Sequence, residues 1–265
     1  MTQQIWNEFT HGKQTYAEIA RHHGRSTKWV QRTLQKAHIS EKKEIQPSDV
    51  VIVMDTTYFK RSFGVMVFRC PHRKKNLLWK FVPYETIAHY RDGISDLEGQ
   101  GWNIRAIVCD GRRGVLQSYP HIPVQMCHFH QIAIVQRYVT SRPKLEPGRG
   151  LLQIIRLLPF LDEEYFTYYL AQWHRVWKEF IQERTVNPET GRWHYTHRRI
   201  RSAYYSILRN IPYLFTYLRF PDLDIPHTSN GLEGCFTHVK KHLRLHSGLK
   251  LERKQHMIEE FLNSQ

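Results

Sequence analysis

The segment VIVMDTT (residues 51–57) decides the fold class, because a run of β-branched and apolar residues leads directly into an acidic one. Residues 50–54 predict a buried central strand that ends at Asp55. The segment AIVCDGRRG (residues 106–114) repeats the pattern, and residues 104–109 predict a second buried strand that ends at Asp110. The sequence therefore predicts an α/β protein in which two adjacent strands each end in a carboxylate.

The elements around these two strands alternate in a regular way. Residues 63–68 and 77–82 predict two more strands, joined by a polar turn in an antiparallel meander. Residues 89–100, 111–118 and 130–139 predict helices, and residues 124–127 predict a short strand. The order β-β-β-α-β-α-β-α is that of the ribonuclease-H-like fold, so we assign residues 50–140 to the first part of such a core.

The first 39 residues predict a separate helical unit that contains a helix-turn-helix. Ala20 is small where two helices would cross, Gly24 suits the turn, and Val30 is an aliphatic anchor in the last helix. Ser26 is a good N-cap for that helix. Its polar side chains would then face a DNA groove: Lys28, Gln31, Arg32 and Gln35. The alternative is a three-helix packing unit that touches no DNA.

Three further segments complete the predicted organisation. Residues 40–49 are polar, with Pro47 near their end, and predict a linker. Residues 141–226 predict an all-helical, aromatic-rich insertion, with helices at 151–158, 163–182 and 198–208. Residues 227–265 predict one or two helices that form the final part of the core.

The charge of the chain favours a polyanionic partner. There are 39 Lys and Arg residues against 24 Asp and Glu residues, a formal net charge of +15. Such an excess favours nucleic acid over generic solubility as its explanation. The four cysteines are too sparse for a disulfide framework, so we expect a reducing compartment. They include no Cys-x-x-Cys pair, which weakens a zinc-ribbon interpretation. Because there is no signal-peptide pattern and no apolar run of ~18 residues, we expect a soluble intracellular protein without membrane contact.

A third acidic motif, TSNGLEGCF (residues 228–236), carries Glu233 in a segment that is typical of a helix. Two strand-end aspartates and one helix-borne glutamate suit a pair of hard divalent cations, which clamp the attacking and leaving oxygens in phosphoryl transfer. Plainer interpretations exist. Asp55 would cap the following turn, and Glu233 would offset a helix dipole. Two buried aspartates on adjacent strands favour metal, because buried carboxylates are costly without a cation.

The motif MCHFHQ (residues 126–131) places Cys127 and His130 three residues apart at a predicted strand-to-helix junction. A zinc site would need further ligands, and no pattern in the sequence ties them together. A structural role is the better interpretation, with Cys127 packed beneath the carboxylates and His130 hydrogen-bonded near them.

The order Asp55, Asp110, Cys127-x-x-His130 and Glu233 resembles that of the DDE transposases of bacterial insertion sequences related to eukaryotic Mutator elements. The resemblance covers roughly residues 50–250 and includes the Asn-Gly-Leu-Glu-Gly segment with the basic sequence that follows it. It implies a ribonuclease-H-like catalytic domain with a helical insertion before the glutamate. It also implies that Asp55, Asp110 and Glu233 are the metal-binding catalytic triad and that Cys127 and His130 are an accessory pair.

The same resemblance implies the cofactors and partners. Two Mg²⁺ or Mn²⁺ ions would bind the triad, and the substrates would be double-stranded DNA, namely terminal inverted repeats and target DNA. Such enzymes act as homodimers or larger synaptic complexes, here in the bacterial cytoplasm and associated with the nucleoid. Two alternatives remain open: a non-catalytic DNA-binding regulator, and a metal-dependent DNA nuclease of the same fold without strand transfer.

Aromatic and basic residues add candidate DNA contacts. Trp173 and Trp177 are better explained by packing in the helical insertion, whereas Trp193 is the best candidate to stack on an unpaired base. Arg198 and Arg199 lie close to it in sequence. A second basic group follows Glu233 and has the residue types that contact phosphate, or that simply form a solvated helix face: Lys240, Lys241, Arg244 and Lys250.

Overall fold

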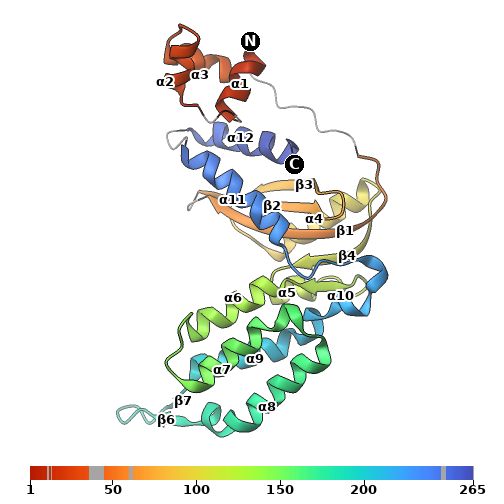
Figure 1. The fold of residues 1–265 in the computed structure, drawn as a ribbon, viewed down its shortest axis with the longest axis vertical. Coiled ribbons are helices and arrows are strands. Elements are labelled where there is room, and N and C mark those ends of the chain that lie inside the picture. The colour runs from red at the N-terminus through yellow and green to blue at the C-terminus, as the bar shows by residue number, and fades with distance from the viewer. Residues whose placement is uncertain (11, 13, 36–44, 60–61, 246–248, 265) are drawn as a thin grey trace.

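The computed structural model describes residues 1–10, 12, 14–35, 45–59, 62–245 and 249–264 (Figure 1). The first half of the predicted linker, residues 40–44, lies outside these ranges. Its last part is described, and residues 45–48 have no regular secondary structure before the first strand begins.

A mixed sheet of five strands lies in the middle of the molecule (Figure 1), in the order β3-β2-β1-β4-β5. Strands β1 (Asp49–Phe59), β2 (Phe63–Cys70) and β3 (Lys75–Val82) form an antiparallel meander. Strands β4 (Asn103–Cys109) and β5 (Val124–Met126) continue the sheet parallel to β1. Helices α4 (Ile87–Gly99), α5 (Arg113–Leu116) and α6 (His128–Val139) alternate with them. The predicted order of elements and the α/β class are therefore confirmed.

Helices cover both faces of this sheet, which explains the continuous apolar run in β1. Successive side chains of a strand point to opposite faces. Val50, Ile52 and Met54 lie in one core with residues of α4 and α6. Val51 and Val53 lie in a second core with helices α11 (Asn230–Leu245) and α12 (Leu251–Ser264).

One strand boundary differs from the prediction in a way that matters for the site. Strand β1 does not end at Asp55 but continues to Phe59, so Asp55 lies inside the strand. The extension arises because β2 pairs with it along its whole length, from Asp55 opposite Val67 to Phe59 opposite Phe63. Thr56 and Thr57 follow Asp55 and interrupt the apolar run, so the sequence gives no sign that β1 continues. Most of the apolar side chains in this part of the pair come from β2.

The N-terminal unit consists of α1 (Thr2–Thr10), α2 (Tyr16–His22) and α3 (Thr27–Gln35). Gly24 has a φ of +58°, which a turn between α2 and α3 requires and glycine adopts readily. Ser26 Oγ accepts a hydrogen bond from the Trp29 backbone N–H at 3.2 Å, as expected of an N-cap. The unit lies beside α12 (Figure 1). The Trp6 ring meets the ring of His256 on this helix edge-on.

The insertion is mostly helical but not entirely so. Its helices are α7 (Glu146–Arg156), α8 (Glu163–Gln182), α9 (Arg198–Leu214) and α10 (Thr216–Arg219), with 3-10 turns at Leu158–Phe160 and Pro221–Leu223. Between α8 and α9, β6 (Arg184–Val186) and β7 (Trp193–Tyr195) form an antiparallel hairpin. The prediction of an all-helical insertion is therefore wrong at this hairpin. Its strands are too short to show a period-2 pattern, and stacking of Arg184 on Trp193, at 4.0 Å, links them instead.

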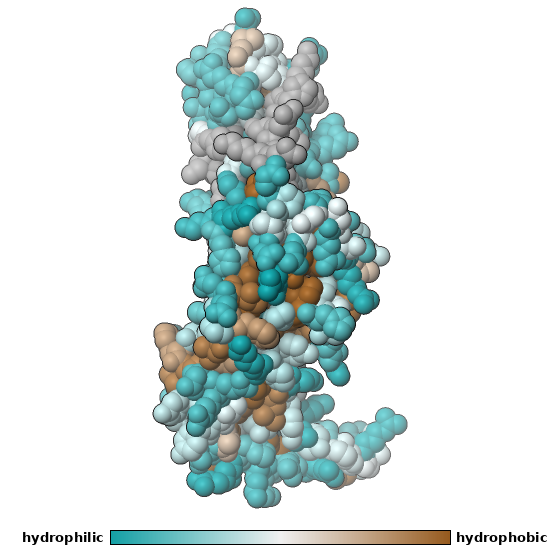
Figure 2. Space-filling model, turned by 90° about the vertical axis from the view of Figure 1, so that its right-hand side faces the viewer, coloured by the Kyte–Doolittle hydropathy of each residue, from teal (hydrophilic) through white to brown (hydrophobic). Residues whose placement is uncertain are grey.

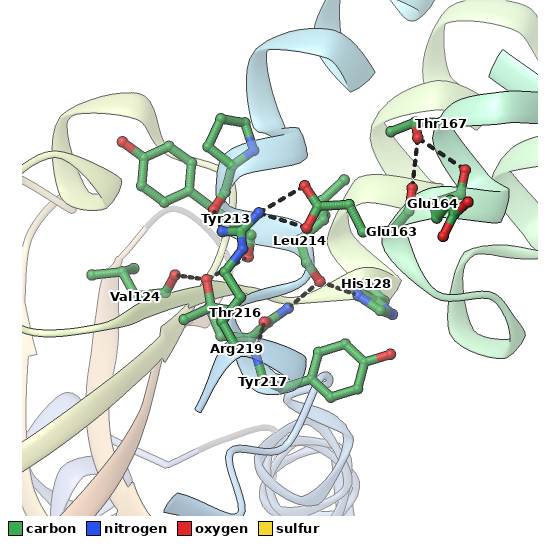
Figure 3. Close-up of polar contacts among 12 residues, drawn as sticks. Val124, His128, Glu163, Glu164, Thr167, Tyr213, Leu214, Thr216, Tyr217 and Arg219 are labelled. Atoms are coloured by element: carbon green, nitrogen blue, oxygen red, sulfur yellow. Dashed lines mark hydrogen bonds and ion pairs between the residues drawn. The ribbon is translucent and has the colours of Figure 1, made fainter. Parts of the chain in front are cut away.

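Buried polar contacts join the end of the insertion to the sheet (Figure 3). Gln125 in β5 donates a hydrogen bond to Leu214 O at 2.9 Å and accepts one from the Tyr217 N–H at 3.0 Å. Thr216 Oγ1 donates to Val124 O at 2.7 Å, and His128 Nε2 lies 2.7 Å from Leu214 O. These contacts give the backbone of the α9–α10 turn partners on β5 and α6, so the insertion has a defined position on the sheet.

Candidate functional site

Asp55 and Asp110 lie on the same face of the sheet. The parallel register of β1 and β4 pairs Val51 with Ala106 and Val53 with Val108. Continued by two residues, this register sets Asp55 beside Asp110, the first residue after β4. Because side chains alternate along a strand, both carboxylates point to the face that α11 covers.

Glu233 reaches this face from the first turn of α11. Leu232, Phe236 and Val239 bury the helix against the same core as Val51 and Val53, which confirms the predicted apolar stripe of this segment. The three carboxylates interact. Burial raises the pKa of Asp55 to about 7, and the negative charges of Asp110 and Glu233 add to the effect, against the opposing influence of His130 and of the Thr56 N–H.

Cys127 and Ser229 fasten the Glu233 segment to the core. Cys127 Sγ accepts a hydrogen bond from the Ser229 backbone N–H at 3.2 Å. Ser229 Oγ lies 3.2 Å from the same sulfur and 3.1 Å from Glu233 Oε1, and its single proton serves one of them at a time. The backbone joins the same parts, because the His128 N–H donates to His227 O at 2.9 Å. Cys127 is thus buried beneath the carboxylates and positions Glu233 through Ser229.

His130 lies between the sulfur and the carboxylates. Its Nδ1 is 3.9 Å from Glu233 Oε1, which is too long for a hydrogen bond. Burial alone would lower the pKa of His130, but the neighbouring Cys127 thiol and the charges of Asp55 and Glu233 raise it to about 9. Burial opposes ionisation of Cys127, yet His130 and Ser229 bring the pKa of the thiol below its ordinary value. His130 therefore places a positive charge among the carboxylates at neutral pH.

A chain of hydrogen bonds supports the two aspartates from the opposite side, and sequence reasoning missed it. Tyr90 OH donates to Glu85 Oε1 at 2.6 Å and lies 3.0 Å from Thr56 Oγ1, next to Asp55. Arg112 donates to Glu85 Oε2 at 2.6 Å, and the Arg112 N–H donates to Asp110 Oδ1 at 3.0 Å. The chain links the backbone next to one aspartate to the loop of the other. The only sequence signal was the acidic Glu85 just before α4.

The donor set fits hard divalent cations. Three carboxylates converge, and the pKa of Asp55 stays raised even beside the positive charge of His130, so a bound cation would relieve a charge that this histidine offsets only in part. Cys127, His130 and Glu233 also have ligand atoms within 4.8 Å of one another. The hydrogen bonds from Ser229 to Cys127 Sγ favour the structural interpretation of the cysteine over a thiolate metal ligand.

The structure places the predicted DNA-contact residues in three separate regions: α3, α11 with the segment after it, and the hairpin with the start of α9. Lys28 and Arg32 are exposed on α3, and Gln31 is half-buried, whereas the side chain of Gln35 lies outside the described part. Lys241, Arg244 and Lys250 are exposed at α11 and the segment that follows it. Lys240 and Arg244 line a groove of about 500 Å³ that also includes Tyr58 and Phe63. On the face drawn in Figure 2, apolar side chains gather near the middle of the molecule, while the N-terminal end is mostly hydrophilic.

The three tryptophans of the insertion separate as expected from the sequence. Trp173 is buried and its Nε1 donates to Pro147 O at 2.9 Å, and Trp177 packs against the same core. Trp193 lies on the hairpin with 51% of its surface exposed. Arg198 and Arg199 are exposed at the start of α9, and Arg199 also donates to Arg137 O at 2.8 Å.

Comparison with protein-family models and with curated proteins finds no match for this chain. Among the described helices, none combines the length and the apolar character needed to cross a membrane. The geometry of the carboxylates and the charge of the chain are therefore the grounds for a function.

Proposed function

We propose that this protein is a DDE-type DNA transposase, which cuts DNA at the ends of an insertion sequence and joins the released 3′-hydroxyls to target DNA. The observation that carries the proposal is the meeting of Asp55, Asp110 and Glu233 from three separate segments on one sheet face. The strand order β3-β2-β1-β4-β5 is the one expected of a ribonuclease-H-like core, and we assign the sheet to that fold.

In this proposal the three carboxylates hold two Mg²⁺ or Mn²⁺ ions, which would activate the attacking oxygen and stabilise the leaving one. The protein's own groups prepare the site. Ser229 orients Glu233, the Tyr90–Glu85–Arg112 chain orients the aspartates, and His130 offsets part of the negative charge. Cys127 and His130 are thus accessory residues that touch the triad without acting on DNA.

DNA would be bound by the basic surfaces. The helix α3 presents Lys28 and Arg32, and α11, which carries Glu233, presents Lys240, Lys241 and Arg244, with Lys250 following it. The hairpin presents Trp193 together with Arg198 and Arg199 on α9. A net charge of +15 supports association with phosphates along an extended length of DNA. We expect a homodimer or larger synaptic complex, because two DNA ends must be brought together.

The decisive experiment is cleavage of a supercoiled plasmid that carries the element's ends, in Mg²⁺ or Mn²⁺, by wild-type protein and by Asp110→Ala. We expect metal-dependent nicking at the ends that falls at least ~1000-fold in the variant, because a metal ligand is lost. Asp92→Ala is the matched control, since Asp92 is an exposed acidic residue on α4.

Two other outcomes would replace the proposal. Tight DNA binding by folded wild-type protein with no cleavage in either metal would indicate a regulator that uses only the basic surfaces. Cleavage without joining of a pre-cut 3′ end to target DNA would indicate a nuclease.

A further inference from the structure

A second group of metal-ligand side chains lies in the N-terminal unit, far from the carboxylates of the sheet. Glu8 on α1 faces His22 and His23 at the end of α2. Glu8 Oε2 is 2.8 Å from His23 Nε2 and 3.6 Å from His22 Nδ1, and one ligand atom from each residue lies within 4.8 Å of the others. We propose that these three residues form a zinc-binding site that joins α1 to the turn before α3.

The distances fit tetrahedral coordination by nitrogen and oxygen. Zinc binds these atoms at about 2.0–2.1 Å, so neighbouring ligand atoms lie about 3.3 Å apart around it. The two measured separations, 2.8 and 3.6 Å, lie on either side of that value, so small side-chain rotations suffice. The set of two imidazoles and one carboxylate is one that zinc takes with water as the fourth ligand.

An ion pair between Glu8 and His23 explains the position of His23 but not that of His22. Glu8 and His23 already form a short hydrogen bond and are both largely shielded from solvent. His22, which is mostly exposed, nevertheless directs Nδ1 toward the same carboxylate, and its ring centroid is 4.8 Å from that of His23. Two imidazoles beside one carboxylate would repel each other if both were protonated. Bound to one cation as neutral ligands, they would not.

The position of the group gives zinc a role in the helix-turn-helix. His23 directly precedes Gly24, the turn residue, and its ring lies 6.4 Å from that of Trp29 on α3. A metal bridge from α1 to this point would fix the orientation of α3, the helix that carries Lys28 and Arg32. Small helical units have little core of their own and gain much from such a bridge.

The test uses the full-length chain and titrates it with Co²⁺, whose visible absorption reports coordination, followed by displacement with Zn²⁺. We expect one Co²⁺ with the strong visible bands of four-coordinate geometry and no thiolate charge-transfer band, whereas Co²⁺ bound by the sheet carboxylates would be six-coordinate and absorb only weakly. The bands should persist in Cys127→Ser, which alters the group near Glu233, and in His121→Asn, an exposed histidine elsewhere. They should vanish in His22→Asn/His23→Asn, with affinity lowered at least ~10-fold.

Glu8→Gln keeps a hydrogen-bond partner for His23 but supplies a poor metal ligand, so it should lose Co²⁺ binding while its far-UV circular dichroism stays unchanged. Co²⁺ binding by both N-terminal variants equal to that of the wild type would overturn the site and leave only a Glu8–His23 pair. The proposed strand-cleavage function is not at stake here, because the readout is metal binding and the variants leave the three sheet-side carboxylates intact.

Discussion

Asp55 and Asp110 reach the site by a different route from Glu233. The two aspartates are set side by side by the backbone register of β1 and β4, so strand pairing alone determines their spacing. Glu233 follows the long insertion and arrives on a helix, where Ser229 and Cys127 hold its first turn through side-chain contacts. The aspartate half is therefore rigid by architecture, and the glutamate half depends on a few contacts that single substitutions can remove.

The largest effect is expected from Asp55→Asn, which separates catalysis from stability. Cleavage should fall at least ~1000-fold because a metal ligand is lost. Burial raises the pKa of Asp55 in the folded protein to about 7, above its ordinary value near 3.8. The free energy of unfolding of the wild type therefore falls as pH rises from 4 to 7, because Asp55 ionises freely only in the unfolded chain. At pH 8 without metal, Asn should raise the free energy of unfolding by about 4 kcal/mol.

Urea denaturation at pH 4 and pH 8 checks this prediction, and the difference between the two proteins should vanish at pH 4. Added Mg²⁺ should stabilise the wild type much more than the variant. Equal stability of wild type and Asp55→Asn at pH 8 would show that burial of the Asp55 carboxylate costs no free energy. That result would contradict the fixed, buried position inferred for the two aspartates.

An intermediate effect is expected from Ser229→Ala on the glutamate half. Loss of the hydroxyl frees Glu233 Oε1 from its 3.1 Å contact, so cleavage should fall about 10–100-fold. The Mg²⁺ concentration for half-maximal rate should rise, and the free energy of unfolding should fall by about 1 kcal/mol. Thr237→Ala is the control, because this exposed hydroxyl bonds only the Glu233 carbonyl, at 3.0 Å. A metal requirement identical to that of the wild type would contradict the positioning role of Ser229.

The smallest effect on catalysis is expected from Tyr90→Phe, which removes a contact of the aspartate half. The buried hydroxyl bridges Glu85 and Thr56, so its loss should lower the free energy of unfolding by about 1–3 kcal/mol. Cleavage should change by no more than a few fold, since strand register still places both aspartates. Tyr84→Phe, at an exposed tyrosine, should change neither quantity. A drop as large as that of Ser229→Ala would erase the distinction between the two halves.

The difference between local patterns and contacts across separate elements also explains which parts could be predicted from the sequence. The apolar runs of β1 and β4 and the stripe of α11 are local patterns, and each gave the correct element. The two strands are also neighbours in the sheet, as predicted. The extension of β1 to Phe59 depends on its pairing with β2, which a local pattern does not contain. The support from Glu85 and Tyr90 arises from contacts across separate elements, so no spacing in the sequence reports it.

The insertion also contains a part, the hairpin, that a local sequence pattern does not predict. Its three longest helices, α7, α8 and α9, carry apolar stripes and were predicted, whereas the short α10 was not. Helix α9 also runs on past residue 208 to Leu214 with Pro212 inside it. The hairpin has strands of three residues, and its contacts are Arg184 on Trp193 and Thr185 with Thr196, whose hydroxyls are 2.7 Å apart. Polar and aromatic residues that meet across a turn have no apolar period to detect.

The N-terminal unit packs against α12, which follows every other described element in the chain. Arg253 on this helix donates to Tyr16 OH at 3.2 Å, so both α1 and α2 meet residues near the other end of the chain. On the ribosome, the helix-turn-helix is complete long before its partner helix has been synthesised. Until residues 251–264 emerge, the unit lacks the contacts that Trp6 and Tyr16 make with His256 and Arg253. The contacts of the N-terminal unit with α12 can therefore form only after every strand of the sheet has been synthesised.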